Sequence, residues 1–176
     1  MKHKIRDSII TLISLLGISA VYRLYMRKKG PLVRVLCFHD VADAQWFGEV
    51  MDMLARNYHV ITPEQFHEHK FDPEKINILL TFDDGYQSWI DNCLPVLHKH
   101  NFKGLFFINS GLLDSADDAE MVADYMQKHL LITPKKPLTW GGARKLIEEG
   151  HTIGGHTVTH PNVALLGDAE ITEEVG

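Results

Sequence analysis

The chain has 176 residues and a formal net charge of −5, with 45% hydrophobic and 23% charged residues. This balance is typical of one globular domain and excludes a disordered tail, a coiled coil or a polytopic membrane protein. The charge is uneven: residues 1–36 carry eight basic side chains and one acid, whereas residues 37–176 carry ten basic and 22 acidic side chains. The acidic body argues against nucleic acid as a partner and suits a neutral or cationic substrate, or a metal ion.

An apolar segment at residues 8–26 lies between basic residues on both sides. At about 1.5 Å per residue it is roughly 28 Å long, enough for the hydrocarbon core of a bilayer. Tyr22 and Tyr25 stand where an interfacial aromatic belt would lie. We therefore expect residues 1–30 to form a single-pass membrane anchor, with a cleaved signal peptide as the alternative. Basic residues after the segment favour a cytoplasmic body, so its orientation stays open.

Short apolar runs then alternate with segments of helical spacing. The sequence predicts strands at residues 32–38, 58–61, 76–82, 104–109 and 151–154. It predicts helices at residues 44–57, 87–100, 139–149 and 168–175, one starting near Pro63, and a further one at 119–131 in an otherwise irregular segment. Thr62 and Thr139 are expected to cap helix starts, and Gly150 to follow a helix end. Near-continuous apolar strands that alternate with helices predict a parallel α/β sheet covered on both faces. A closed (β/α) barrel needs about 250 residues, so residues 31–176 are expected to form a small open sheet or the front part of a barrel.

The chain has two cysteines, Cys37 and Cys93, which are far apart and form no CxxC pair. This spacing argues against a disulfide framework and against a thiolate zinc site. Cys37 lies in an apolar run, so we expect it to be a buried thiol.

Two adjacent carboxylates, Asp83 and Asp84, follow the clearest predicted strand in the motif TFDDG. Parallel α/β folds bind ligands at the carboxyl ends of their strands. Neighbouring carboxylates repel each other there and stay ionised when a cation or hydrogen-bond donors are present. A simple Asp-Gly turn is the alternative, but a turn needs only one aspartate.

Two histidines, His156 and His160, follow the last predicted strand in the motif HTVTHP. Histidines at positions i and i+4 can face one metal ion, although Pro161 disfavours a helix at His160. Alone, this spacing is a weak signal that also fits a surface loop. Together with the aspartates it predicts one carboxylate and two imidazoles on one rim, which suits a catalytic Zn²⁺ or Co²⁺ with open positions for water and substrate. The second carboxylate is then free to act as a base.

These motifs resemble those of the polysaccharide deacetylase family, the NodB-homology or family 4 carbohydrate esterases. The similarity covers roughly residues 32–176 and extends to CFHDV at 37–41 and GLFFINSGLL at 104–113. It implies a distorted (β/α) barrel that removes acetyl groups from sugar polymers. By resemblance, Asp84, His156 and His160 bind the metal ion, and Asp83 is the general base.

That family has three further motifs downstream, which include an Arg-x-Pro segment and a Leu-x-His that carries the general acid. None of them is found between His160 and Gly176. We therefore expect a NodB-type barrel that is incomplete in this chain, and we assign no general acid. His39 is expected near the rim, either at the site or only in packing.

The leading interpretation is a metal-dependent hydrolase that acts on an acetylated polysaccharide or cell-envelope glycan. It would be held on the outer face of the cytoplasmic membrane through residues 8–26. The alternatives are a non-catalytic carbohydrate- or metal-binding module and a related metal amidohydrolase acting on small cyclic amides. The expected membrane anchor disfavours the amidohydrolase, because an enzyme of soluble small molecules needs no anchor.

Overall fold

The computed structural model describes Tyr25 and residues 30–175. The predicted membrane anchor at residues 8–26 lies outside these residues except for Tyr25. Within the described part, no helix is both long and apolar enough to cross a bilayer. The strands are β1 (Leu32–Phe38), β2 (His59–Ile61), β3 (Ile76–Phe82), β4 (Leu105–Ile108) and β5 (Thr152–Gly155). The alternation of strands and helices that the sequence predicted is confirmed.

The helical segments follow the strands in the chain. They are α3 (Ala44–Asn57), α4 (Pro63–His67), η1 (Trp89–Cys93), α5 (Leu94–His100), α6 (Ser110–Asp114), α7 (Ala119–Tyr125), η2 (Met126–Leu130), α8 (Trp140–Glu148), η3 (Val163–Leu165) and α9 (Asp168–Val175). The helix predicted at residues 87–100 is divided, because its first turn is a π-helix and only α5 is α-helical. Pro95 has no backbone N–H to bond the carbonyl four residues earlier, which explains the wider turn before it.

All strand pairs in the described sheet are parallel, in the order β1-β3-β4-β5, with β2 also paired to β3. β3 is central: β1 pairs with its whole length, while β2 pairs with its first half and β4 with its last two residues. The carboxyl ends of β1, β3, β4 and β5 therefore meet at one edge of the sheet. The segments that follow these strands carry the residues of the candidate site.

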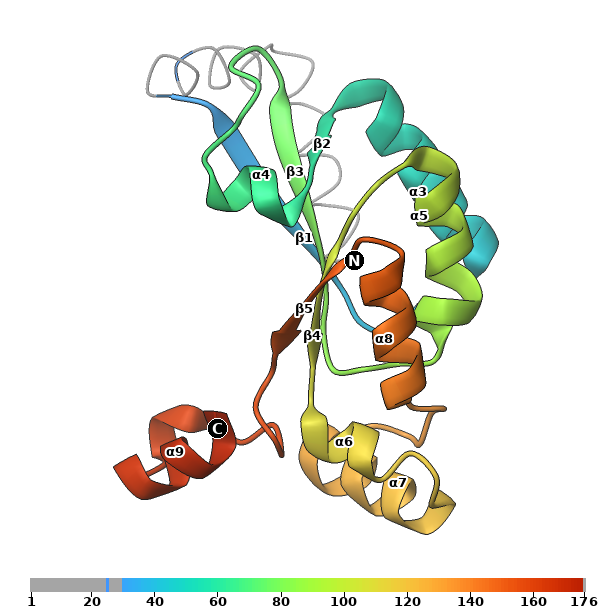
Figure 1. Cartoon of the computed structure of the whole chain (residues 1–176), viewed down its shortest axis with the longest axis vertical. Helices are drawn as coiled ribbons and strands as arrows, with labels where there is room; N and C mark the ends of the chain where they lie inside the picture. Colours follow the sequence, from blue (N-terminus) through green and yellow to red (C-terminus); the bar gives the residue numbers. More distant parts are fainter. Residues whose placement is uncertain (1–24, 26–29, 176) are drawn as a thin grey trace, which may run out of the picture.

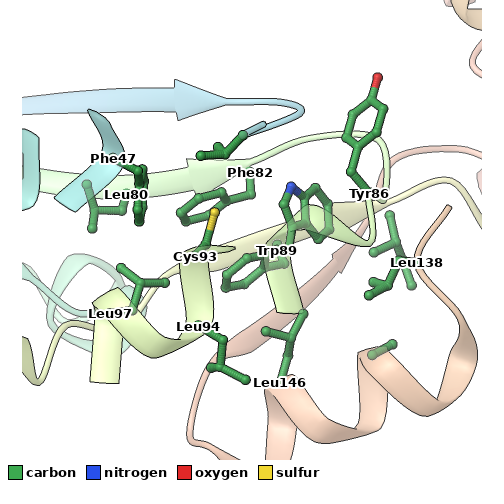
Figure 2. Close-up of a cluster of buried hydrophobic side chains, with 14 of the residues drawn as sticks. Phe47, Leu80, Phe82, Tyr86, Trp89, Cys93, Leu94, Leu97, Leu138 and Leu146 are labelled. Carbon is green, nitrogen blue, oxygen red and sulfur yellow. The ribbon is translucent and has the colours of Figure 1, made fainter. Parts of the chain in front are cut away.

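The hydrophobic core lies between the sheet and one layer of helices. Figure 1 shows α3, α5 and α8 together on one side of the sheet, with the short α4 away from them. At the centre, Phe82 of β3 stacks on Phe106 of β4 with ring centroids 4.3 Å apart. Trp89 of η1 packs beside Phe82 (Figure 2) and also contacts Phe106. Together these buried rings secure the carboxyl ends of β3 and β4 against the helical layer.

The expectation that helices cover both faces of the sheet is wrong for β1. The side chain of Val35 is 52% exposed, and Cys37, two residues further on the same face, is exposed as well. The even-numbered Leu36 and Phe38 pack against the core instead. The physical reason is that α3, α5 and α8 share one face, so apolar composition alone did not reveal the open face.

Three local signals read from the sequence are confirmed. Thr62 and Gln65 form a reciprocal capping box at the start of α4. The hydroxyl of Thr139 accepts a hydrogen bond from the backbone N–H of Gly142 and caps α8. Beyond the end of α8, Gly150 has φ +81°, a conformation that glycine adopts without strain.

Candidate metal centre

Three side chains converge at the carboxyl edge of the sheet: Asp84, His156 and His160. One ligand atom from each lies within 4.8 Å of the other two. Nε2 of His156 and Nε2 of His160 both lie 3.8 Å from Oδ1 of Asp84. Asp84 is only 5% exposed, whereas His156 is half-buried and His160 is exposed. A buried carboxylate facing two accessible imidazoles is a donor set that a divalent cation can bridge.

Asp84 occupies its position through a strained backbone. Its φ is 84°, in a region that is disfavoured for side chains with a Cβ but less so for aspartate. Its carbonyl accepts a hydrogen bond from the backbone N–H of Asn109 at the end of β4, at 3.0 Å. The hydroxyl of Tyr86 donates to Asp84 Oδ2 at 2.9 Å. These bonds from either side hold the carboxylate in place.

The histidine pair lies in the loop between β5 and η3 (residues 156–162, the histidine loop), not on a helix. The backbone N–H of His156 donates to the carbonyl of Ile108 at 2.9 Å, and the side-chain amide of Asn109 donates to the carbonyl of His156. Thr157 and His160 both have positive φ, 67° and 58°. Strain at a β-branched residue such as Thr157 persists only where surrounding contacts impose it, and such sites are often functional.

Further contacts to the loop that carries the two histidines come from α6, α7 and α9. The hydroxyl of Tyr125 donates to the carbonyl of Val158 at 2.7 Å, and the N–H of Gly111 reaches the same oxygen at 3.2 Å. A Cβ at Gly111 would lie 2.7 Å from that oxygen, so only glycine permits this approach. From α9, the Glu174 carboxylate accepts hydrogen bonds from the N–H groups of Val158 and Thr159 and from the Thr159 hydroxyl.

Asp83, the residue assigned by resemblance as the base, does not join the converging three. Its backbone N–H donates to the carbonyl of Phe38 at 2.8 Å, and its half-buried side chain turns toward β1. There the Cys37 thiol donates to Asp83 Oδ2, with 3.0 Å between Sγ and the oxygen. Partial desolvation by its neighbours, followed by this hydrogen bond to Asp83, raises the pKa of Cys37 to about 11, so the thiol is protonated and donates at neutral pH. The expectation of a buried Cys37 is therefore wrong, because the thiol lies on the open face of β1.

A groove of about 500 Å³ opens beside His156. Its wall includes Ile153 of β5, Val158 of the loop after β5 and Trp140 at the start of α8. The indole of Trp140 is 40% exposed, and its Nε1 donates to Asp114 Oδ1 at 2.9 Å, which fixes the ring orientation. The groove thus offers an apolar, partly aromatic surface next to the histidine pair.

Sequence reasoning missed three residues that support the site: Tyr86, Asn109 and Glu174. Asn109 stands at the carboxyl end of a predicted strand, so the rule that selected the aspartates could also have selected it. Tyr86 lies two residues after Asp84, and its proximity was the available signal. Glu174 had no local signal, because it lies on α9 and the residues that it contacts precede it by 15 and 16 positions.

Known proteins resemble this chain in sequence. A family model described as polysaccharide deacetylase matches residues 70–176. The peptidoglycan-N-acetylglucosamine deacetylase of Bacillus cereus is 28% identical over 102 residues, which are 57% of this chain and 29% of that protein. The chitooligosaccharide deacetylase of a Bradyrhizobium species is 27% identical over 100 residues, which are 56% of this chain and 35% of that protein. The chain thus spans about a third of the length of these curated relatives.

Solved structures show the same fold. The Streptococcus pyogenes deacetylase PplD, in complex with acetate, aligns with a TM-score of 0.61 and 17% identity over 82% of this chain and 64% of that one. IcaB from Ammonifex degensii aligns with a TM-score of 0.60 and 20% identity over 80% of this chain and 58% of that one. The resemblance noted in the two motifs is therefore confirmed, since the matched family model covers more than half of the residues. The chain belongs to the polysaccharide deacetylase family.

Proposed function

We propose that the protein is a metal-dependent deacetylase that hydrolyses acetyl groups, N-acetyl above all, on a polysaccharide or glycan of the cell envelope. The observation that carries this proposal is the convergence of Asp84, His156 and His160 beside a second carboxylate, Asp83. Membership of the family supports it, as do relatives named as deacetylases of peptidoglycan and chitooligosaccharides.

The donor set fits a catalytic divalent ion, because one carboxylate and two imidazoles leave coordination positions for water and substrate. We assign Asp84, His156 and His160 to hold it, with Zn²⁺ or Co²⁺ as the preferred ions. When bound, the ion supplies Lewis acidity, which polarises the acetyl carbonyl and lowers the pKa of water. Tyr86 holds one oxygen of Asp84 and leaves Oδ1 to face the histidines.

Asp83 acts as the general base in this proposal. The hydrogen bonds that hold its backbone to Phe38 and its Oδ2 to Cys37 leave Oδ1 to accept the proton of the attacking water. The water oxygen bonds to the acetyl carbon, the C–N bond to the sugar breaks, and the leaving amine takes up a proton. We assign no donor for that last proton among the described residues.

The groove beside His156 is the proposed place of the sugar ring. A pyranose presents an apolar C–H face that packs on an exposed aromatic ring, and the oriented indole of Trp140 provides such a ring. An acetyl group on a sugar seated there would point toward the histidine loop, which borders the groove.

The test is acetate release from an acetylated chito-oligosaccharide by the full natural chain, after chelation and after addition of Zn²⁺ or Co²⁺. We expect release only with metal, and a loss of about 10²–10⁴-fold in Asp83→Asn, because general base catalysis is removed. Asp117→Asn, an exposed acid away from the site, is the matched control. If metal-loaded protein binds the oligosaccharide and releases no acetate, the chain is a binding module and the proposal is wrong.

A further inference from the structure

A second group of metal-ligating side chains lies next to the first, on the open face of β1. Cys37, His39 and Asp83 each offer one ligand atom, and these atoms lie within 4.8 Å of one another. The Sγ atom of Cys37 lies 3.0 Å from Oδ2 of Asp83. The group shares no residue with Asp84, His156 and His160.

Strand register brings the three residues together. Cys37 pairs with Thr81 and Phe38 with Phe82, so the next residues, His39 and Asp83, leave β1 and β3 at the same level. Because side chains two apart on a strand share a face, Cys37 and His39 point to the same side of β1. The three donors therefore meet through the ladder of two parallel strands.

The backbone beneath these donors is held firmly. The N–H of Asp83 bonds to the carbonyl of Phe38 at 2.8 Å. The indole Nε1 of the fully buried Trp89 donates to the carbonyl of His39 at 2.9 Å. Only side-chain torsions are then left to adjust when an ion is bound, which limits the entropy lost on binding.

The chemistry of the donors selects the ligand. A thiolate, an imidazole and a carboxylate are all ligands of Zn²⁺, and the soft sulfur disfavours Mg²⁺ and Ca²⁺. Cys37 and His39 are exposed, so an ion has a path from solvent and a fourth position for water. The absence of a CxxC pair argued against a thiolate zinc site, but a single cysteine suffices when the sheet supplies the other ligands.

We propose that Cys37, His39 and Asp83 form a second binding site for a thiolate-preferring divalent cation, Zn²⁺ in the first place. On binding, a sulfur–metal bond replaces the S–H bond of Cys37, and the proton passes to solvent. The ion then takes the place of that proton between the sulfur and Asp83. No electron is transferred in this exchange.

Occupation of this second site is inhibitory. The ion coordinates the Asp83 carboxylate and neutralises its charge, so the carboxylate no longer accepts a proton from water. This consequence rests on the proposed function, in which Asp83 is the base, whereas the binding itself does not. Excess Zn²⁺ should therefore slow an enzyme that the first equivalent activates.

Cobalt binding by the full natural chain tests the site, because Co²⁺ bound to a thiolate absorbs in the near ultraviolet through sulfur-to-metal charge transfer. We expect the native chain to bind two ions and to show this band. Cys37→Ser should bind one ion without the band. Cys93→Ala is the matched control and should keep the band, since Cys93 is the other cysteine and lies in the core. Asp84→Asn should lose the other ion and keep the band.

No band in the native chain at saturating Co²⁺, or a band that persists in Cys37→Ser, overturns the second site. Circular dichroism on each variant verifies that it is folded. To test the inhibition, acetate release by each protein is measured at excess Zn²⁺ and at one equivalent of Zn²⁺. The first value is then divided by the second for the same protein. This ratio should fall in the native chain and not in Cys37→Ser, and an equal fall in both would overturn the consequence. If no acetate is released under any condition, the proposed function fails while the cobalt band still decides the second site.

Discussion

The hydroxyl of Tyr86 donates a 2.9 Å hydrogen bond to Oδ2 of Asp84, and the other oxygen of the same carboxylate lies 3.8 Å from Nε2 of both His156 and His160. Burial, followed by the charge of Asp84, raises the pKa of Tyr86, so its hydroxyl stays protonated and acts as a donor. The bond thus fixes which oxygen of Asp84 faces the histidines. Groups that orient a ligand in this way are worth about 10–100-fold in metal affinity.

Tyr86→Phe should therefore weaken binding of the first metal ion by about 10–100-fold and leave the fold intact, because only one hydroxyl is removed. Titration calorimetry with Zn²⁺ in the Cys37→Ser background measures this single site. Tyr58→Phe, at the end of α3, is the matched control and should bind like its parent. Equal affinity of Tyr86→Phe and Tyr58→Phe would show that Tyr86 does not orient the ligand.

The two adjacent aspartates should differ in metal binding. In the Cys37→Ser background, Asp84→Asn should lose the remaining ion, because a buried ligating charge is removed, whereas Asp83→Asn should retain it. Asparagine tolerates the positive φ of 84° at position 84, so the backbone is preserved. Elemental analysis of folded, dialysed protein measures the outcome. Equal metal loss in both variants would contradict the division of roles.

Glu174 should control the mobility of the histidine loop. Although its burial opposes ionisation, hydrogen bonds from Thr159 and Val158 lower the pKa of Glu174, so it is a charged acceptor at neutral pH. Hydrogen bonds to charged groups contribute about 1.5–3 kcal/mol each. Glu174→Ala should speed amide hydrogen exchange at Val158 and Thr159 by about tenfold or more, which mass spectrometry can follow.

Glu173→Ala is the matched control for that experiment, because Glu173 is an exposed residue of the same helix. It should leave exchange in the loop unchanged. If exchange at Val158 and Thr159 is equally fast in both variants, α9 does not hold the loop through Glu174.

His151 should make the fold sensitive to acid. It is buried, and its Nδ1 accepts a hydrogen bond from the N–H of Gly104 at 3.1 Å. Burial, followed by the charge of Lys103, lowers the pKa of His151 from its ordinary 6.5 to about 4. The unfolded chain thus takes up a proton at this residue as pH falls below about 6.5, while the folded chain does not until about 4. Stability contributed by neutral His151 is present above that range and is lost progressively within it.

Between pH 7 and pH 5 the free energy of unfolding should fall by about 2 kcal/mol on account of this residue. His151→Gln keeps an acceptor for Gly104 and removes the titration. Urea unfolding at both pH values should therefore show a smaller decrease for the variant than for the native chain. Equal decreases in the two proteins would mean that His151 is protonated in the folded state.

The predicted anchor at residues 8–26 can be tested by fractionation. The basic flanks and the length of the apolar stretch predict that the full chain sediments with membranes, whereas a chain starting at Leu32 does not. Protease added to intact cells then tests the orientation. If residues 31–176 are protected from digestion, the predicted location on the outer face of the membrane is wrong. Recovery of the full chain, at unchanged length, in the soluble fraction would refute the anchor.

Much of the architecture could be predicted because its strands and helix starts depend on residues that are close together in the chain. The runs at 32–38 and 76–82 are apolar over the length of one strand, and the structure places β1 and β3 at these residues. The hydroxyls of Thr62 and Thr139 cap the helices that follow them, so single residues indicate where these helices begin. The aspartates of TFDDG and the histidines of HTVTHP were selected for the same reason, since each motif directly follows a strand.

The exposure of Cys37 was decided only by the tertiary structure. The sequence of an apolar run does not show which of its faces the helices will cover. In the described sheet β1 is an edge strand, with α3, α5 and α8 all on one side. Likewise, the register of β1 on β3 sets His39 level with Asp83, although 43 intervening residues separate them in the chain. No periodicity in the sequence relates positions that far apart.

The sequence by itself therefore determined the strands, the helix caps and the residues that carry acid–base and metal-binding chemistry, because each of these depends on neighbours within a few positions. The tertiary structure alone decided which of those residues meet. It turned Asp84 toward His156 and Asp83 toward Cys37, and it brought Glu174 under the histidine loop. Adjacent aspartates face different partners because the chain bends at Asp84, where φ is 84°, and this bend is held by hydrogen bonds from Asn109 after β4 and from Tyr86.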